Sequence, residues 1–432
     1  LFGKIRNTAD EGKTESVAPE FIVSKKTILI KNLRVTDSNI TGHQNVGGIV
    51  GNSDGAGIKD CYFEGNVKGT YNSVGAIVGL ANAETVVNQC QTTGTVTGEQ
   101  RTGGVVGYAN GNSVVSKCYS NASVTGTRNV GGIVGTLSGG SLVGCFYRGN
   151  VTADNRVGGI IGYSTMSVVR GAYAIGGVNS AGADKGGAVG IIFGGEFASI
   201  FYCFEMSQCD GPVGIGRTMD ELYTADFVKE LNKAMPYFCF DYTEINDGFP
   251  VLMWMLQSDV WSGELEVPKK NDSGYYLIYK PSELAWFAGL VNGTIPGVNA
   301  NPSANAEVMD NLLFNINVYD DSMAITEWTP IGTSSKPYTG SFKGGGFNIA
   351  GIYTSVNATE DGKNIGFFGY VGSGAQIDNV LIMDGLICGV ENVGGIAGYV
   401  MGAQVSNCVS NSEVRGDKAV GGVAGNILAG AK

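Results

Sequence analysis

Val130-Gly131-Gly132-Ile133-Val134-Gly135 is one of five six-residue phrases of the same pattern within residues 46–162. The phrase that begins at Val74 has alanine in place of the second glycine, and the other three begin at Val46, Thr102 and Val157. The first glycines stand at positions 47, 75, 103, 131 and 158, so the steps between them are 28, 28, 28 and 27 residues. A fixed period of this size predicts a stack of equivalent structural units.

The apolar residues within one period do not recur at helical spacing. In the third unit, residues 103–108, 113–119 and 123–126 form three short β-rich runs, separated by polar turns at 109–112 and 120–122. Three runs predict a triangular coil, and stacked coils pair their strands in parallel, about 4.8 Å apart. The sequence therefore predicts an all-β fold, a parallel β-helix (β-solenoid).

A column of cysteines follows the same period. Six of the nine cysteines are assigned to it, and Ala172 occupies the same place in one further coil; the six are Cys61, Cys90, Cys118, Cys145, Cys203 and Cys408. The alanine indicates that this position takes a small apolar side chain packed in the core. Unpaired cysteine is common in such buried positions. Neighbouring coils would also bring the Cα atoms close enough for disulfides, so that alternative stays open.

The phrase is followed in several units by Cys-Tyr and then by a Gly-x-Val run, as in Cys61-Tyr62 with Gly65-Asn66-Val67. This combination resembles the GLUG motif, which is known from large bacterial surface proteins. They include adhesin-like proteins of gut anaerobes and the non-catalytic portions of some IgA-cleaving metallopeptidases. The resemblance implies a right-handed β-helix in an extracellular protein of the bacterial cell surface, and it brings no catalytic residues with it.

The beginning of the chain is a copy of its end at an offset of 347 residues, because residues 30–35 match 377–382 and residues 45–48 match 392–395. We therefore expect two tandem solenoids with short capping helices. The first spans residues 1–216, a capping helix and junction follow at 217–263, and a polar linker occupies 264–274. The second spans residues 275–432, with a capping helix at about 282–291 and GLUG units from residue 393.

Two further expectations concern the caps and ends of the solenoids. Thr218 starts a capped amphipathic helix that runs to about Ala234 and is expected to cover the open end of the first solenoid. Residues 4–26 have no counterpart in the later copy and are expected to form an excursion from a coil. The two incomplete copies indicate a piece of a longer tandem array; the alternative is a finished protein whose ends are closed by other contacts.

Charge and composition exclude several partners. The net charge is −11 and the pI is near 4.7, which argues against nucleic acid or an anionic membrane surface. No apolar run reaches the roughly 20 residues of a membrane-spanning helix, so no membrane insertion is expected in this segment. The expected partner is a glycan or protein of a host or neighbouring cell, and further β-helix domains of the same polypeptide are a second expected partner.

The residues that carry chemistry are few. His43 is the single histidine and lies in a polar turn, so a two-histidine zinc site cannot form within this chain. The candidate carboxylate pairs, Asp320 with Asp321 and Asp241 with Asp247, are turn-type residues. The sequence predicts no catalytic, cofactor or metal site, hence a non-enzymatic adhesin-like or stalk protein. A carbohydrate-binding or carbohydrate-cleaving module remains the alternative, and a filament of end-stacked molecules is a third.

Overall fold

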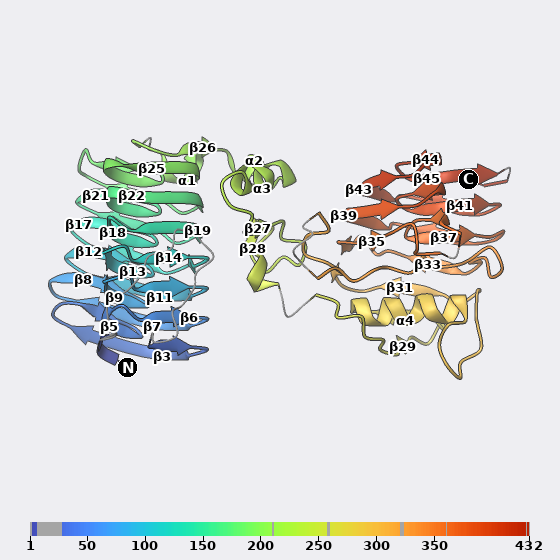
Figure 1. Cartoon of the computed structure of the whole chain (residues 1–432), viewed down its shortest axis with the longest axis horizontal. Helices are drawn as coiled ribbons and strands as arrows, with labels where there is room; N and C mark the ends of the chain where they lie inside the picture. The colour runs from blue at the N-terminus through green and yellow to red at the C-terminus, as the bar shows by residue number, and fades with distance from the viewer. Residues whose placement is uncertain are drawn as a thin grey trace, which may run out of the picture. The chain divides into compact units, whose positions relative to one another are not determined.

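The computed structural model describes residues 2–6, 28–209, 211–256, 260–319, 324–359, 361–428 and 430–431. The chain divides into two compact units, Leu1–Phe240 with Phe249–Trp254, and Asp241–Gly248 with Met255–Lys432. Each unit contains a solenoid of parallel, stacked β-strands, and the whole chain has about 14 turns (Figure 1). The all-β solenoid fold with short helices is therefore confirmed.

The third coil shows how one period folds. It consists of β12 (Gln100–Gly103), β13 (Val106–Ala109), β14 (Val114–Ser116), β15 (Tyr119–Ser120) and β16 (Ser123–Thr125). The predicted first run is broken because the chain bends between Gly103 and Val106, so the coil has a fourth, short side. A Cβ on Gly103 would lie 2.1 Å from the carbonyl oxygen of Val106, which only glycine avoids. The predicted triangular outline was wrong in this respect.

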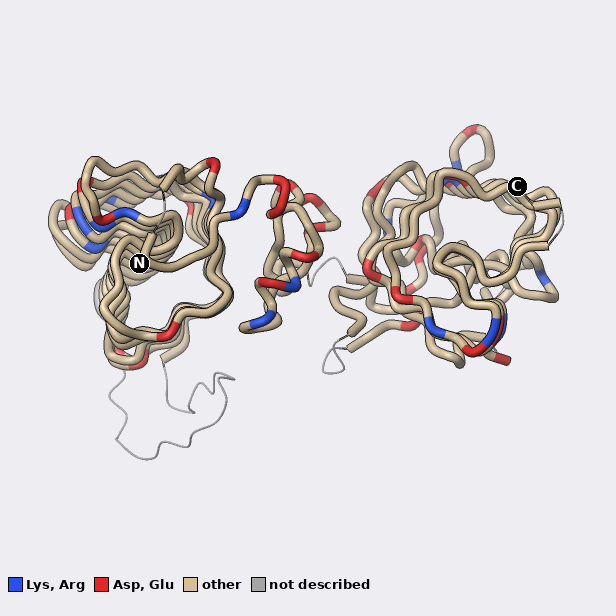
Figure 2. The backbone as a smooth tube through the Cα atoms, turned by 90° about the horizontal axis from the view of Figure 1, so that it is seen from above, with Lys and Arg blue, Asp and Glu red and all other residues tan. Residues whose placement is uncertain are grey.

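The short sides of the first unit pair as a six-stranded ladder, which we call the glycine ladder. Its members are β4 (Val46–Gly47), β8 (Asn72–Gly75), β12, β17 (Arg128–Gly131), β21 (Asn155–Gly158) and β24 (Lys185–Gly186). The other sides form a 20-stranded sheet, whose coils superimpose when seen from above (Figure 2). Besides β13–β16 this sheet contains β1 (Phe2–Arg6), β2 (Leu29–Lys31), β3 (Arg34–Gly42), β5 (Val50–Asp54), β6 (Gly57–Lys59), β7 (Tyr62–Gly69), β9 (Val78–Asn82), β10 (Val86–Asn88), β11 (Gln91–Thr97), β18 (Val134–Ser138), β19 (Ser141–Tyr147), β20 (Val151–Ala153), β22 (Ile161–Ala174), β23 (Val178–Ser180), β25 (Val189–Cys203) and β26 (Ile215–Arg217).

The cysteine column lies inside the first solenoid. Tyr62 pairs with Gln91 and Gln91 with Tyr119, which sets the cysteines that precede them in register. Four of them are buried free thiols: Cys61, Cys90, Cys118 and Cys145. Each thiol donates to the backbone carbonyl two residues earlier, for example Cys118 to Ser116 at 3.1 Å. The core interpretation is therefore confirmed for these four cysteines.

Cys203 does not belong to that column, contrary to the sequence assignment. Ala172 pairs with Ile200, so Ile200 continues the column, and Cys203 pairs instead with Arg217 of β26. Cys203 lies 17 residues after Gly186, whereas the column cysteines follow their glycines by 14 or 15 residues. The two or three extra residues carry Cys203 past the column position.

The burial of the column predicts which thiols react with an alkylating reagent. We expect Cys388 and Cys408, which are partly exposed, to be modified in the folded protein before Cys61, Cys90, Cys118 and Cys145. Peptide mass spectrometry after timed iodoacetamide treatment, with and without denaturant, measures this order. Modification of Cys118 in the folded chain at the rate of Cys408, or a disulfide-linked peptide joining two column cysteines, would contradict it.

The helical segment after the first solenoid differs from the single helix predicted at 218–234. It forms α2 (Met219–Leu222) and α3 (Ala225–Asn232), and a further short helix, α1 (Phe204–Ser207), precedes them. Thr218 and Glu221 form the predicted capping box, but Thr224 caps a second helix by accepting a hydrogen bond from the backbone N–H of Phe227 at 3.2 Å. Thr218 and Thr224, six positions apart, each cap the start of a helix, so the segment forms two helices instead of one.

This segment covers a side of the first solenoid, and not only its end as predicted. Phe227 of α3 packs edge-on against Tyr173 and Phe201, with ring centroids 5.8 and 5.1 Å apart. The antiparallel pair β27 (Phe238–Cys239) and β28 (Val251–Leu252) follows, and then the 3₁₀ helix η1 (Met253–Met255). Within η1, Trp254 Nε1 donates to the carbonyl oxygen of Lys117 at 2.8 Å. Apolar side chains on the outer face of the coils determine where the segment docks.

The second unit begins with a hairpin and a helix. β29 (Lys269–Lys270) pairs antiparallel with β30 (Tyr276–Ile278), so residues 264–274 belong to this unit and do not form the predicted linker. Asn271 Oδ1 accepts the backbone N–H groups of Ser273 and Tyr275, both at 3.0 Å, and so fixes the turn. The helix expected at 282–291 is confirmed as α4 (Pro281–Asn292), and it is buried along nearly its whole length.

Parallel ladders follow the hairpin and α4 in the second unit. Trp328 and several phenylalanines, among them Phe342 and Phe367, fill its core. The strands are β31 (Ala306–Val308), β32 (Leu312–Leu313), β33 (Ser341–Lys343), β34 (Asn348–Ala350), β35 (Tyr353–Thr354), β36 (Lys363–Ile365), β37 (Phe368–Val371), β38 (Gln376–Asp378), β39 (Leu381–Cys388), β40 (Glu391–Gly394), β41 (Ala397–Met401), β42 (Gln404–Ser406), β43 (Val409–Arg415), β44 (Lys418–Gly421) and β45 (Ala424–Leu428).

Candidate functional site

Two of the residues singled out in the sequence, His43 and Asp241, lie in the described part of the chain. His43 is exposed, as predicted; its Nδ1 lies 3.0 Å from Thr70 Oγ1, and its ring stacks on Tyr71 with centroids 5.5 Å apart. Asp241 is buried and accepts three backbone N–H groups, from Ile245 at 3.1 Å, Asn246 at 2.6 Å and Gly248 at 3.1 Å. Asp241 therefore fixes the loop 241–248.

Of the two candidate carboxylate pairs, Asp241 with Asp247 lies in the described part of the chain, where Asp241 accepts hydrogen bonds from the backbone of its own loop. Asp320 and Asp321 lie outside the part of the chain that the structure describes, as does most of the excursion expected at residues 4–26. Among the described residues, no group of three or more His, Cys, Asp or Glu side chains lies close enough to hold a metal ion. In the same part of the chain, no helix is long and apolar enough to cross a membrane.

Outward-facing polar side chains repeat along the first solenoid. Asn66 Nδ2 donates to Asn39 Oδ1 at 2.7 Å, and Thr95 Oγ1 donates to Asn66 Oδ1 at 2.6 Å. A second column of mostly threonine side chains runs beside this one, on Thr41, Lys68, Thr97, Thr125 and Thr152. The side chains of Asn39, Asn66 and Thr95, on neighbouring coils, thus hydrogen-bond to one another, and the two columns together form a polar strip.

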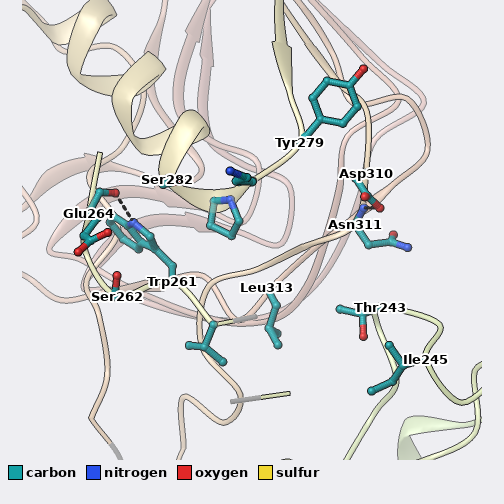
Figure 3. Close-up of a pocket in the computed structure, with 13 residues that line it drawn as sticks. Thr243, Ile245, Trp261, Ser262, Glu264, Tyr279, Ser282, Asp310, Asn311 and Leu313 are labelled. Atoms are coloured by element: carbon teal, nitrogen blue, oxygen red, sulfur yellow. Dashed lines mark hydrogen bonds between the residues drawn. The ribbon is translucent and has the colours of Figure 1, made fainter. Parts of the chain in front are cut away.

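The second unit has a groove of about 520 Å³ (Figure 3). This volume lies within the range of small-ligand sites, about 300–1,000 Å³. The loop 241–248, residues 260–264, the start of α4 and the connection before β32 contribute side chains to it, all within the second unit. The groove is lined by Thr243, Ile245, Val260, Trp261, Ser262, Glu264, Tyr279, Lys280, Pro281, Ser282, Asp310, Asn311 and Leu313.

Two aromatic side chains stand on different sides of this groove (Figure 3). Trp261 is held in place: its Nε1 donates to the carbonyl oxygen of Glu264 at 2.8 Å, and its ring packs edge-on against Phe314 at 5.3 Å. Tyr279 is 47% exposed. Trp261 therefore forms a fixed wall of the groove, and Tyr279 offers an accessible ring.

The polar groups of the groove are oriented by the backbone around them. Asp310 Oδ1 accepts the backbone N–H of Asn311 at 2.8 Å, and Asn311 Oδ1 accepts the backbone N–H of Asn348 at 2.8 Å. The ammonium group of Lys280 is paired with Glu266, at 3.0 and 3.1 Å from its two carboxylate oxygens. Glu264 and Asp310 add two carboxylates, so the groove favours neutral or cationic ligands over anionic ones.

The groove was not predicted from the sequence. Its residues come from segments up to 70 positions apart that follow no repeat, and part of it lies in the stretch predicted to be a linker. A sequence signal that could have indicated it is Trp261, an aromatic residue close to the polar residues Asp259, Ser262 and Glu264.

One comparison with known proteins identifies a coil of the first unit. Residues 42–68, which run from the end of β3 into β7, match the family described as Glug, the GLUG motif. This confirms the resemblance predicted from the repeated phrases, on one coil of the stack. No curated protein and no solved structure matches the chain.

Proposed function

We propose that this GLUG repeat chain is a non-enzymatic, adhesin-like or stalk protein of the bacterial cell surface. The observation that carries the proposal is the pairing of equivalent residues along the solenoid, in the backbone ladders and in the outward side chains such as Asn39, Asn66 and Thr95. Each coil is fixed on both sides by its neighbours, which makes a stiff element suited to holding a binding surface away from a cell. Loops and side faces of such a scaffold are free to vary and to bind.

A carbohydrate-cleaving module is the second candidate, and one observation favours it. Glycoside hydrolysis requires two carboxyl groups on either side of the scissile bond. Glu264 and Asp310 both line the groove of the second unit (Figure 3). Product analysis therefore has to accompany any binding experiment on this protein.

The test of the proposed function is a binding array of glycans and host-matrix proteins, probed with the full chain with and without calcium and followed by product analysis of each hit. We expect saturable binding to at least one component, with the bound glycan or protein recovered intact. A cleaved product would overturn the non-enzymatic proposal in favour of the second candidate. Failure to bind any component of the array or the surface of whole host cells would overturn the adhesin proposal.

A further inference from the structure

We propose that the groove between Trp261 and Tyr279 is a binding site for a neutral saccharide. The inference rests on the proposed adhesin function and assigns the ligand class to one site. A pyranose ring has one apolar face of C–H groups and a rim of hydroxyl groups, so a site for it needs an aromatic surface beside several hydrogen-bonding groups. The groove provides both within about 520 Å³.

The aromatic part of the site is Tyr279, supported by Trp261. Tyr279 is 47% exposed, and its backbone N–H donates to Glu283 Oε2 at 2.7 Å, which fixes the backbone from which the ring projects. Trp261 is anchored by Glu264 and Phe314. Covering the exposed Tyr279 ring with the apolar face of a sugar removes apolar surface from water on both partners.

The polar part of the site is suited to hydroxyl groups. Carboxylate and amide oxygens accept hydrogen bonds from sugar hydroxyls, and serine and threonine hydroxyls both donate and accept. These groups lie around the groove on Glu264, Ser282, Asp310 and Thr243. Hydrogen bonds to a carboxylate are the strong ones among them, so Asp310 and Glu264 are expected to contribute most.

The charged side chains of the groove favour a neutral saccharide over an anionic one. Glu264 and Asp310 are acidic, and Lys280, the one lysine among the described residues that line the groove, is already paired with Glu266. A sialylated, sulfated or uronic saccharide would bring a further negative charge beside two carboxylates and find no unpaired lysine in the lining. A neutral hexose or N-acetylhexosamine brings no such charge, and the site is assigned to this class.

The walls are held in place before a ligand arrives. The loop that carries Thr243 and Ile245 is fixed by Asp241 through three backbone N–H groups. Asn311 is tied to the backbone of Asn348 on the neighbouring coil, at 2.8 Å. A site whose groups are already ordered loses less entropy on binding, which raises its affinity for a ligand.

The test measures saccharide binding by the full chain and by two groove variants, Tyr279→Ala and Asp310→Asn. Neutral and anionic oligosaccharides are titrated by calorimetry, and intact mass analysis of the sugar follows. We expect wild-type protein to bind a neutral saccharide, and each variant to bind it about tenfold more weakly or worse. The matched control is Tyr71→Ala, which removes a 42% exposed tyrosine from the first unit and is expected to leave the affinity unchanged. Unfolding curves confirm that all variants are folded.

The outcomes separate this inference from the proposed function. Equal saccharide affinity in the wild type, Tyr279→Ala and Asp310→Asn would place the sugar elsewhere and overturn the site. A preference for anionic saccharides would also overturn it. Binding to a matrix protein without binding to any saccharide would overturn the site and leave the adhesin proposal intact. Cleavage of the saccharide would uphold the ligand class and overturn the non-enzymatic function.

Discussion

Gly132→Ala is expected to lower the free energy of unfolding of the first unit by about 3 kcal/mol or more. Gly132 is the second glycine of its phrase, and a Cβ there would lie 2.2 Å from the carbonyl oxygen of Gly159 in the next coil and 2.3 Å from the ring of Tyr147. Neither neighbour can move freely. Gly159 is part of the stacked backbone, and Tyr147 is fully buried with its hydroxyl donating to the carbonyl oxygen of Ala122 at 2.9 Å.

The matched control is Gly422→Ala, at the same position of the phrase Val420-Gly421-Gly422-Val423. A Cβ on Gly422 would meet no atom within 4 Å, so we expect a change of about 0.5 kcal/mol or less. Hydrogen exchange followed by peptide mass spectrometry in increasing urea measures each unit separately. Equal protection of the first unit in the wild type and in Gly132→Ala would show that the close approach of the coils does not require glycine.

The period of the phrases was sufficient to predict the stack, because equivalent residues of neighbouring coils pair directly. Val50, Val78, Val106 and Val134 follow one another at 28 residues and form one continuous ladder. A constant spacing of equivalent residues in the sequence gives a constant register between neighbouring coils, since each coil stacks on the one before it. The assignment failed where the spacing changed, as at Cys203, because that residue follows its glycine by 17 positions.

Corners of the coils were harder to predict than strands. The residue before each column cysteine has a positive φ, 52° at Asp60, 51° at Gln89 and 51° at Lys117. Asparagine, aspartate and glycine adopt this conformation readily, and glutamine and lysine do so much less often. At Gln89 and Lys117 the stacked neighbours impose the conformation, and residue preference alone gives no sign of it.

The polar stretch before the second solenoid shows a similar limit. Pro268-Lys269-Lys270-Asn271-Asp272-Ser273-Gly274 has the composition of a linker, and the same residues suit a tight turn between paired strands. Which one forms depends on Leu277 and Tyr276, which pair with the two lysines. The groove depends in turn on where the loop 241–248 and residues 260–264 pack beside the start of α4, and composition does not encode such contacts between distant segments.

Raising the pH from 8 to 10 is expected to destabilise the first unit by about 3 kcal/mol through Cys90 and Cys118 alone. Both thiols are fully buried, and burial raises the pKa of each well above its ordinary value of 9.0. Below pH 9 the thiols are protonated in the folded and the unfolded chain, so they do not make stability depend on pH. Above pH 9 the unfolded chain loses these protons while the folded chain keeps them, so stability falls by up to about 1.4 kcal/mol per pH unit for each thiol.

The double variant Cys90→Ala/Cys118→Ala separates this effect from the titration of other groups. Alanine already occupies the column at Ala172, so the coil accommodates it, although the smaller side chains lower the overall stability. Urea unfolding of both proteins under reducing conditions at pH 8, 9 and 10, at constant ionic strength, measures the slope of stability against pH. We expect the variant to lose about 3 kcal/mol less than the wild type over this range. Equal slopes would mean that water reaches the cysteine column in the folded solenoid, which the close stacking of the coils around these thiols argues against.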